Sequence, residues 1–543
     1  MGPSDTATLR NSAANAGYPR TSVKSRLGWT SVIVCLSFLF FIQAYYGIIS
    51  QSASYDETPY LGIGKYLLKT HRWDVPGSIL HPPLAFYLPS LPLLFVDTNE
   101  SVWRYPDAHR DLTFLGSQDL GRGQALLSSI ENSDDRLLIM SRLMVALTGV
   151  LLGYVVYRFA SELYGEKAGA LAMGLYTFCP NMIAFSGFIV PDVVLTLFYF
   201  LSVFWLWKAI RTGGPRHHVI AGFSLGLALL SKFTALILLP VEAILIALSF
   251  RRDRVSGLKL VPIVFLVASA VFLSGYFFDI SPYLKGIEFQ RTHAEQGHGA
   301  FLMGQYSTHG WWYYYLVTFL IKTPLPTLLL LSAAIYVYAR DVKRGDRNMA
   351  VLFLALPAAA VFGFFSLGDM DIGLRYILPV YPFIYASIGR LTRAASCTMR
   401  YFIYAMVLWQ AGAAAFVAPH YISYFNEAIG GPANGYKYLV DCNLDWGQDL
   451  KSLKRYMDRN KIDSINLSYF GTDLPERYGI RYVNLHDFPL DNPKAEIPPG
   501  LIAISVTDLQ GIYFNDKTAF SWLKAYTPVG RVGYSMLIYD ISQ

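Results

Sequence analysis

Charged residues are scarce in this sequence. Asp, Glu, Lys and Arg make up 15% of the 543 residues, and 53% are hydrophobic; ordinary soluble proteins carry about 25% charged residues. The mean hydropathy of +0.34 agrees with this balance. These values exclude an ordinary soluble protein, so we interpret the chain as a polytopic α-helical membrane protein.

Cysteine, clustered basic charge and internal repeats are also lacking. The four cysteines, Cys35, Cys179, Cys397 and Cys442, lie far apart, which excludes a disulfide framework and a zinc-binding spacing. The net charge of +7 is spread over short loops and not gathered in one patch, so nucleic acid is not expected as a partner. No repeat of a few tens of residues indicates a solenoid.

A cleavable signal peptide is not evident either. Residues 1–26 are polar, and the apolar segment 29–49 is too long for a signal peptide but long enough to cross a bilayer. We expect a disordered cytoplasmic tail over 1–28, followed by a signal-anchor helix.

About eleven membrane spans are expected. The segments 218–231 and 233–250 form either a tight reversal or one long broken helix, and the proline-rich run 82–96 is too short to span alone, so it is interpreted as interfacial or re-entrant. The expected spans are 29–49, 137–159, 168–186, 191–208, 218–231, 233–250, 259–278, 312–338, 349–366, 374–389 and 401–418.

Lys and Arg concentrate before the first span and in alternate short loops, which the positive-inside rule assigns to the cytoplasm. The loops 50–135 and 279–311 then lie outside. We therefore expect a transmembrane domain over 29–418 and an extracytoplasmic tail over 419–543.

The tail changes character. Runs at 464–469, 501–506 and 535–539 are typical of strands, and 445–460 has helical spacing. About 125 residues suffice for one small α/β domain.

Candidate functional residues gather at the outer face. Asp56 and Glu57 follow the first span, and His81, Asp192, Lys232 and Arg375 lie at other outer boundaries. Each has an ordinary explanation alone: Asp192 as a helix-dipole partner, Lys232 and Arg375 as interfacial side chains. Together, carboxylates for general base catalysis and cations for a leaving phosphate suit group transfer from a lipid phosphate.

The loop 279–311 is rich in histidine and aromatic residues. His293, His298 and His309 do not have a zinc-binding spacing. Such groups are suited to stacking on sugars or hydrogen bonding to them, although an aromatic belt at a membrane interface looks the same.

These residues resemble one known family in their order along the chain. The similarity is to the polyprenyl-phosphate-sugar-dependent membrane glycosyltransferases of the GT-C fold, in the protein O-mannosyltransferase and aminoarabinose-transferase-like group. It rests on Asp56-Glu57 with Tyr60, His81-Pro82-Pro83-Leu84, Pro191-Asp192, Leu229-Leu230-Ser231-Lys232, Arg375-Tyr376-Ile377-Leu378-Pro379 and the tail run Asn443-Leu444-Asp445-Trp446-Gly447-Gln448-Asp449-Leu450.

The resemblance implies an inverting hexosyltransferase that moves one sugar, mannose or a related one, from undecaprenyl or dolichyl phosphate to a protein, lipid or glycan acceptor. It implies Asp56 as general base, with Glu57 supporting it or positioning the acceptor or a metal ion, and Asp192 as a second acid. Lys232, Arg375 and His81 become candidates for the donor phosphate. Tyr60, His293 and His298 are our candidates for acceptor or sugar contacts.

Two departures from the family pattern matter. Many relatives have Lys where this chain has His81, so phosphate binding there needs a protonated imidazole or a plain hydrogen bond. The loop 279–311 is too short for the sugar-binding insert of eukaryotic protein mannosyltransferases, which favours an enzyme of the bacterial cytoplasmic membrane and cell envelope.

Several alternatives stay open. Asn443 or Asp445 caps a helix over 446–460, or the tail run recognises the acceptor. No cofactor is required, although outer aspartates suit Mg²⁺ or Mn²⁺. A lipid-linked oligosaccharide ligase or polymerase, a membrane transporter and a non-catalytic scaffold are the other functions considered.

Overall fold

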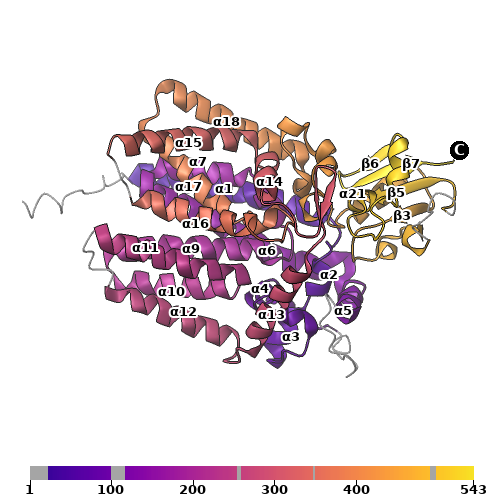
Figure 1. The fold of residues 1–543 in the computed structure, drawn as a ribbon, viewed down its shortest axis with the longest axis horizontal. Helices are drawn as coiled ribbons and strands as arrows, with labels where there is room; N and C mark the ends of the chain where they lie inside the picture. Colours follow the sequence, from indigo (N-terminus) through magenta and orange to yellow (C-terminus); the bar gives the residue numbers. More distant parts are fainter. Residues whose placement is uncertain (1–22, 99–116, 253–258, 346–348, 489–496, 543) are drawn as a thin grey trace, which may run out of the picture.

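The computed structural model describes residues 23–98, 117–252, 259–345, 349–488 and 497–542 (Figure 1). Most of the expected cytoplasmic tail, 1–28, lies outside these ranges. The first helix is already formed at Val23.

Apolar helices form a bundle that makes up most of the molecule (Figure 1). Their sequences are hydrophobic, and helices satisfy their own backbone hydrogen bonds, as the interior of a bilayer demands. The helices are α1 (Val23–Ser50), α6 (Arg136–Tyr164), α7 (Glu166–Thr177), α9 (Pro191–Thr212), α10 (Pro215–Leu229), α11 (Leu238–Arg252), α12 (Val261–Gly275), α15 (Leu325–Lys343), α16 (Ala350–Ser366), α17 (Val380–Ile388) and α18 (Cys397–Val417).

Within the described ranges, five helices are long and apolar enough to cross a membrane by themselves. Two shorter apolar helices, 261–275 and 350–366, accompany them. The expected number of eleven spans stays a prediction, because several expected spans consist of two pieces: 168–186 is divided between α7 and α8 (Pro180–Phe185), and 312–338 between α14 (Tyr314–Lys322) and α15.

The segments 218–231 and 233–250 form two separate helices. α10 ends at Leu229, Lys232 is extended, and a 3₁₀ turn over Phe233–Ile237 leads into α11. α10 packs mainly on α9 and α12, whereas α11 packs on α9 and α16. The tight reversal is therefore the correct one of the two alternatives, and Lys232 lies at its tip.

Short helices cover one end of the bundle (Figure 1). They occupy the two segments expected as outer loops, 50–135 and 279–311, of which the second is not a plain loop but a helix followed by a hairpin. These elements are α2 (Glu57–Tyr60), α3 (Ile63–Thr70), α4 (Leu84–Ser90), α5 (Ser117–Leu127), α13 (Ser281–Gln296), β1 (Ala300–Leu302) and β2 (Gln305–Ser307).

The tail adds a five-stranded mixed sheet at the same end (Figure 1). The strand order is β4-β3-β5-β7-β6; β3 pairs in parallel with β4 and β5, and β7 pairs antiparallel with β5 and β6. Strands were expected at three places, where β3, β5 and β7 confirm them. The strands are β3 (Ile465–Ser468), β4 (Tyr482–Asn484), β5 (Leu501–Ser505), β6 (Gly530–Val532) and β7 (Met536–Asp540).

The two faces of this sheet are covered differently. Leu450, Leu453 and Met457 of helix α19 (Leu450–Arg459) share a cluster with Ala503 of β5, whereas the alternating residues Ile502 and Ile504 belong to the large cluster that contains the membrane helices. Side chains alternate between faces along a strand. One face of the sheet is therefore packed against its own helix, and the other is continuous with the main core.

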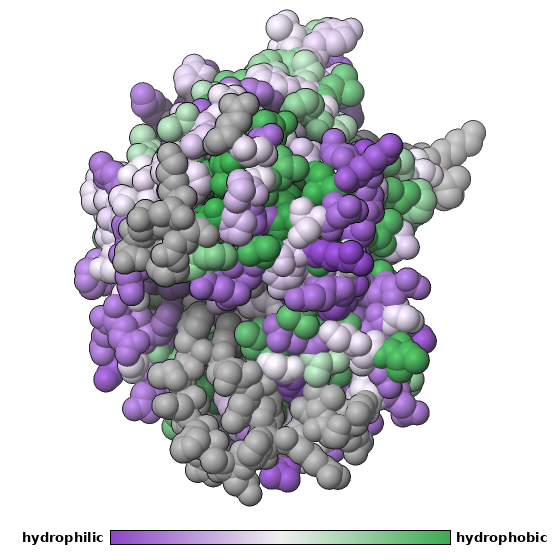
Figure 2. Space-filling model, turned by 90° about the vertical axis from the view of Figure 1, so that its right-hand side faces the viewer, coloured by the Kyte–Doolittle hydropathy of each residue, from purple (hydrophilic) through white to green (hydrophobic). Residues whose placement is uncertain are grey.

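The outer surface of the bundle is apolar. Phe38 on α1, Leu266 on α12, Tyr336 on α15 and Phe416 on α18 are exposed, as expected for side chains that face lipid. The sheet end carries many hydrophilic residues between smaller hydrophobic areas (Figure 2), in agreement with a position outside the bilayer.

Candidate active site

Asp56 lies where the first loop turns into α2. Its Oδ2 accepts a hydrogen bond from Arg375 Nη1 at 2.7 Å, and about 12% of each side chain is exposed. Arg375 comes from a 3₁₀ turn, Leu374–Ile377, more than 300 positions later. The fold therefore brings together two residues that the sequence analysis had selected separately.

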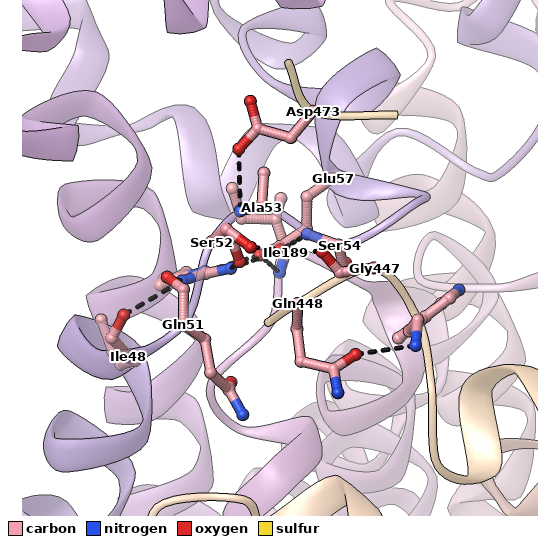
Figure 3. A network of polar contacts seen from close by, with 12 residues as sticks. Ile48, Gln51, Ser52, Ala53, Ser54, Glu57, Ile189, Gly447, Gln448 and Asp473 are labelled. Atoms are coloured by element: carbon pink, nitrogen blue, oxygen red, sulfur yellow. Dashed lines mark hydrogen bonds and ion pairs between the residues drawn. The ribbon is translucent and has the colours of Figure 1, made fainter. Parts of the chain in front are cut away.

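Glu57, the neighbour of Asp56, points into a different environment (Figure 3). It is fully buried, and Arg142 Nε and Nη2 donate to its two oxygens at 2.8 and 2.6 Å. The backbone N–H groups of Ser54 and Ile189 donate to the same oxygens, each at 2.8 Å. The carboxylate is thus fully engaged, and it fixes the start of α2 against α6 and the turn before α9.

Arg142 also holds the chain that leads into Asp56. Its Nη1 donates to the carbonyl oxygens of Ile48 and Gln51, and its Nη2 to that of Ser52. Five donors in a rigid plane suit an arginine to such convergent contacts. The end of α1, the first loop and α2 are therefore tied to one buried guanidinium group.

The tail segment 443–449 pairs with the same loop. The N–H groups of Ser52 and Tyr55 donate to the carbonyl oxygens of Gln448 and Trp446 at 2.9 and 2.8 Å. Gly447 has φ of +80°, and a Cβ there would lie 2.8 Å from the Cα of Gly471, so a side chain does not fit this approach. Two segments almost 400 residues apart form one backbone frame around Asp56.

Two tail side chains contact the turn that carries Arg375. The Arg375 guanidinium lies 4.6 Å from the centre of the Trp446 ring, within cation–π range. Asn443 Oδ1 accepts from the N–H of Leu374 at 3.0 Å, and its amide nitrogen donates to the carbonyl of Ile372 and to the Tyr314 hydroxyl. Both residues are buried.

A second ion pair lies beside the first. Lys232 Nζ donates to Asp192 Oδ1 at 2.8 Å, and both side chains are buried. Asp192 Oδ2 has no hydrogen-bond partner among the described residues. The centre of the Tyr376 ring lies 4.2 Å from Lys232 Nζ and 5.5 Å from the Arg375 guanidinium, so both cations are in cation–π range of one ring.

His81 and Tyr60 contact each other. The Tyr60 hydroxyl and His81 Nε2 are 3.1 Å apart, and His81 Nδ1 is buried without a partner. Burial lowers the pKa of His81 well below its usual 6.5, and the charges of Lys232 and Arg375 act in the same direction. The imidazole is therefore neutral near pH 7, which leaves the plain hydrogen bond as its means of binding a phosphate.

A cavity of about 560 Å³ opens at this place. Three parts of the chain line it: the first loop with Arg375, the end of α13, and the tail. Of the candidate residues, Asp56, Tyr60, His81, His293, His298 and Arg375 line it, whereas Glu57, Asp192 and Lys232 do not. The tail contributes Asp441, Trp446, Tyr469, Phe470, Gly471, His486, Asp508, Tyr513 and Phe514.

Asp441 is a further acid at the cavity. The Tyr513 hydroxyl donates to its Oδ2, and the N–H of Cys442 donates to its Oδ1 at 2.6 Å. Burial raises the pKa of Asp441 to about 6. His298 Nε2 lies 3.1 Å from the same Tyr513 hydroxyl. Burial and His293 lower the pKa of His298 to about 4, so that imidazole is neutral.

Within the described ranges, no group of three or more His, Cys, Asp or Glu side chains is placed to hold a metal ion. His293 and His298 contact each other through their rings, and Asp56 is paired with Arg375. Among the described residues, three carboxylates, one arginine and several histidine and tyrosine rings line the cavity.

Arg142 was not among the residues predicted from the sequence, and one of the two interpretations of the tail segment is wrong. An arginine inside an expected span is a signal for a buried polar contact, and that signal was present in 137–159. The expected helix cap at Asn443 or Asp445 is wrong: α19 begins at Leu450, and the residues before it are buried against the first loop. Their role depends on contacts across the chain that helical spacing does not reveal.

The chain was compared with known protein families and solved structures. A family model described as dolichyl-phosphate-mannose-protein mannosyltransferase matches residues 125–276, less than a third of the chain. Among solved structures, ArnT from Cupriavidus metallidurans bound to undecaprenyl phosphate matches with 14% identity and a TM-score of 0.50, over 94% of this chain and 98% of that one. Its apo state matches with 13% identity and the same TM-score, over 95% and 98%.

A less similar fold is that of the oligosaccharyltransferase AglB from Archaeoglobus fulgidus in complex with an inhibitory peptide and a dolichol-phosphate. It has 14% identity and a TM-score of 0.48, over 93% of this chain and 73% of that one. The comparison with curated proteins finds no match.

The chain is an integral membrane protein of the GT-C type. It resembles, more particularly, the membrane glycosyltransferases of the protein O-mannosyltransferase and aminoarabinose-transferase-like group. The fold, the family match and the site together support a glycosyltransferase.

Proposed function

We propose that this protein is an inverting glycosyltransferase that moves a single sugar, mannose or a related hexose, from a polyprenyl-phosphate carrier to an acceptor outside the cytoplasm. The observation that carries the proposal is Asp56, a carboxylate that lines a cavity and is held by Arg375 at 2.7 Å. A second cation, Lys232, contacts the same Tyr376 ring as Arg375.

Asp56 is the general base in this proposal. The acceptor oxygen attacks the anomeric carbon of the donor sugar, and its proton passes to Asp56. The bond between that carbon and the phosphate oxygen breaks, and the polyprenyl phosphate leaves with the electron pair. Attack from the face opposite to the phosphate inverts the anomeric configuration. General base catalysis of this kind contributes about 10²–10⁴-fold to a rate.

Arg375 and Lys232 are the cations for the phosphate. An arginine presents several donors to phosphate oxygens, and a lysine adds a point charge. Phosphate binding relieves part of the attraction between Arg375 and Asp56, which frees the carboxylate to accept a proton. His81 and Tyr60 supply neutral hydrogen bonds beside them.

Glu57 and Asp192 act through these residues. Glu57 holds the start of α2, and with it Asp56, through Arg142. Asp192 orients Lys232 through its Oδ1. We assign both as positioning residues, and His293 and His298 as contacts for the transferred sugar at the α13 side of the cavity.

We infer undecaprenyl or dolichyl phosphate as the carrier. The family model names dolichyl-phosphate-mannose, and the ArnT structure contains undecaprenyl phosphate. We place the tail 419–543 and the cavity outside the bacterial cytoplasmic membrane, with the N-terminus inside, because the basic loops lie at alternate connections.

The test is sugar release from radiolabelled undecaprenyl- and dolichyl-phosphate monosaccharides by the purified full chain in detergent, with membrane extract as acceptor source. Wild type is expected to transfer label, and Asp56→Asn to lose about 10²-fold or more. Arg291→Lys, an exposed change on α13, serves as the control. Absence of turnover in wild type, or full activity in Asp56→Asn, contradicts the proposal.

A further inference from the structure

The wall of the cavity that the tail builds has no role in the proposed transfer so far. It is built by the tail, from the residues after β3, from the turn after β4 and from the segment after β5. The side chains are Phe470, His486, Asp508, Tyr513 and Phe514, together with Asp441. Their chemistry differs from that of Arg375 and His81, the residues proposed to bind the donor phosphate.

Aromatic rings form the flat part of this wall. The Phe470 ring is stacked between Tyr55 and Tyr513, with ring centres 5.1 and 5.3 Å apart and planes 17° and 10° from parallel. The Phe514 ring meets the edge of His486 at 5.5 Å. Rings held in this way present a rigid apolar surface at low cost in conformational entropy.

Acidic groups border the rings. Asp508 Oδ2 accepts hydrogen bonds from Ser468 Oγ at 2.7 Å and from His486 Nε2 at 3.0 Å, while Asp441 accepts from Tyr513. Asp508 raises the pKa of His486, although burial opposes this shift. Among the described residues that line the cavity, Arg375 is the sole lysine or arginine.

This arrangement discriminates between acceptors. Carboxylates at the wall repel phosphate and carboxylate groups, because like charges brought together at a binding surface are costly. They accept hydrogen bonds well from hydroxyl groups. Rings beside carboxylates therefore match a molecule with apolar C–H faces and several hydroxyl groups.

We propose that this wall is the acceptor subsite, and that the acceptor is an uncharged carbohydrate. The proposal rests on the proposed function. A sugar of the acceptor lies against the exposed ring of Tyr513, which Phe470 supports from behind, its hydroxyl groups donate to Asp508, and the hydroxyl that reacts is directed toward Asp56. That hydroxyl oxygen bonds to the anomeric carbon of the donor sugar, its proton goes to Asp56, and the carrier phosphate leaves with the electrons of the broken bond.

The experiment offers the purified full chain a radiolabelled polyprenyl-phosphate sugar and three acceptor panels at equal concentration: neutral disaccharides, the same disaccharides carrying a phosphate, and short peptides rich in Ser and Thr. Transfer is expected to the neutral disaccharides, at least tenfold above the other two panels. Preference for the phosphorylated sugars or for the peptides overturns the proposal.

Variants locate the subsite. Phe470→Leu and Asp508→Asn are expected to raise the acceptor KM about tenfold more than the donor KM, since a hydrogen bond to a charged group or a lost ring contact is of that size. Tyr482→Phe, an aromatic change in the same sheet away from the cavity, is the matched control. Equal effects on both KM values overturn the subsite.

The two proposals fail in different ways. If wild type turns over no carrier with any panel, the glycosyltransferase proposal is wrong, and the acceptor-subsite proposal that depends on it is wrong as well. If wild type turns over the carrier but prefers another panel, the enzyme proposal stands and the carbohydrate subsite alone is wrong.

Discussion

The two adjacent acids, Asp56 and Glu57, differ completely in environment. The Asp56 side chain lines a cavity and pairs with Arg375, whereas Glu57 is buried and accepts four hydrogen bonds, two of them from Arg142. Neighbours in sequence at the start of a helix point in different directions. Substitutions of Asp56 are therefore expected to affect mainly activity, and substitutions of Glu57 mainly stability.

Glu57→Gln is expected to destabilise the protein by about 3–5 kcal/mol, because it leaves the Arg142 guanidinium buried without its counter-charge. Asp56→Asn is expected to cost less, because Asp56 and Arg375 line the cavity and are 13% and 12% exposed, whereas Glu57 and Arg142 are fully buried. Thermal unfolding of both variants in the same detergent checks this. Equal unfolding midpoints for Glu57→Gln and wild type contradict the role given to the pair.

Arg375→Lys tests the planar guanidinium. A lysine retains the charge but loses the fork of donors and much of the contact with the Trp446 ring. We expect the donor KM to rise about tenfold with a smaller change in acceptor KM. The steady-state kinetics of transfer measure both constants, and a change confined to the acceptor KM argues against phosphate binding by this residue.

Protonation of His81 is expected to lower the stability of the folded protein as the pH falls. Its folded pKa is lowered by burial, so between that pKa and 6.5 the unfolded chain binds more protons than the folded one. Its contribution to stability is thus complete above pH 6.5 and is lost as the pH falls below that value.

Unfolding midpoints of His81→Gln between pH 7.5 and 5.0 check this, and the variant should lose less stability on acidification than wild type does. His486→Gln is the opposite case, because Asp508 raises the pKa of His486 and its protonation favours the folded state. A steeper acid loss in His81→Gln than in wild type contradicts the argument.

Among the structural elements, the segment 443–449 connects the tail to the site. Its backbone carbonyl groups accept hydrogen bonds from the first loop, and its side chains contact the turn that carries Arg375. The segment contacts both the loop that carries Asp56 and the turn that carries Arg375. Its side chains are therefore expected to affect catalysis without touching the substrate phosphate.

Trp446→Leu and Arg375→Lys are expected to be non-additive. Each single change weakens the same cation–π contact, so the second costs less once the first is present, with a coupling of about 0.5–2 kcal/mol. A double-mutant cycle on kcat/KM measures it. Trp409→Leu, an aromatic residue outside the cavity whose ring nitrogen donates to Glu427, serves as the control. Strict additivity contradicts the positioning role of Trp446.

At the scale of the whole molecule, the tail is joined to the membrane bundle by a common core. Ile502 and Ile504 of β5 and Leu537 of β7 belong to the same cluster as the membrane helices, and Arg477 and Lys451 of the tail pair with Asp135 at the start of α6. The cavity itself is lined from both sides. Neither part contains the site alone.

A chain shortened to residues 1–418 is expected to lose transfer completely and to unfold at a lower temperature, because it exposes the apolar surface that the sheet covers and removes the support of Arg375 and Asp56. Size-exclusion chromatography and thermal unfolding in detergent, with the full chain beside it, measure this. A shortened chain that keeps its elution position, stability and activity contradicts the joint core.

Much of the architecture follows from the sequence because hydrophobicity is a local property. Runs of apolar residues mark the helices, alternating residues mark β3, β5 and β7, and the basic loops predict one orientation. The helix breaks at Thr323-Pro324 and Ser231-Lys232 are harder to interpret, since an apolar run looks the same whether it is one helix or two.

The class of protein and most of its helices and strands could be predicted from the sequence alone. So could the candidate residues Asp56, His81, Asp192, Lys232 and Arg375. The tertiary structure alone decided their pairing: Arg375 with Asp56, Lys232 with Asp192, and Glu57 with Arg142. It also decided that the tail forms a wall of the cavity. The physical reason is that hydrophobicity and helix spacing depend on nearby residues, whereas ion pairs and cavities depend on contacts between residues tens to hundreds of positions apart.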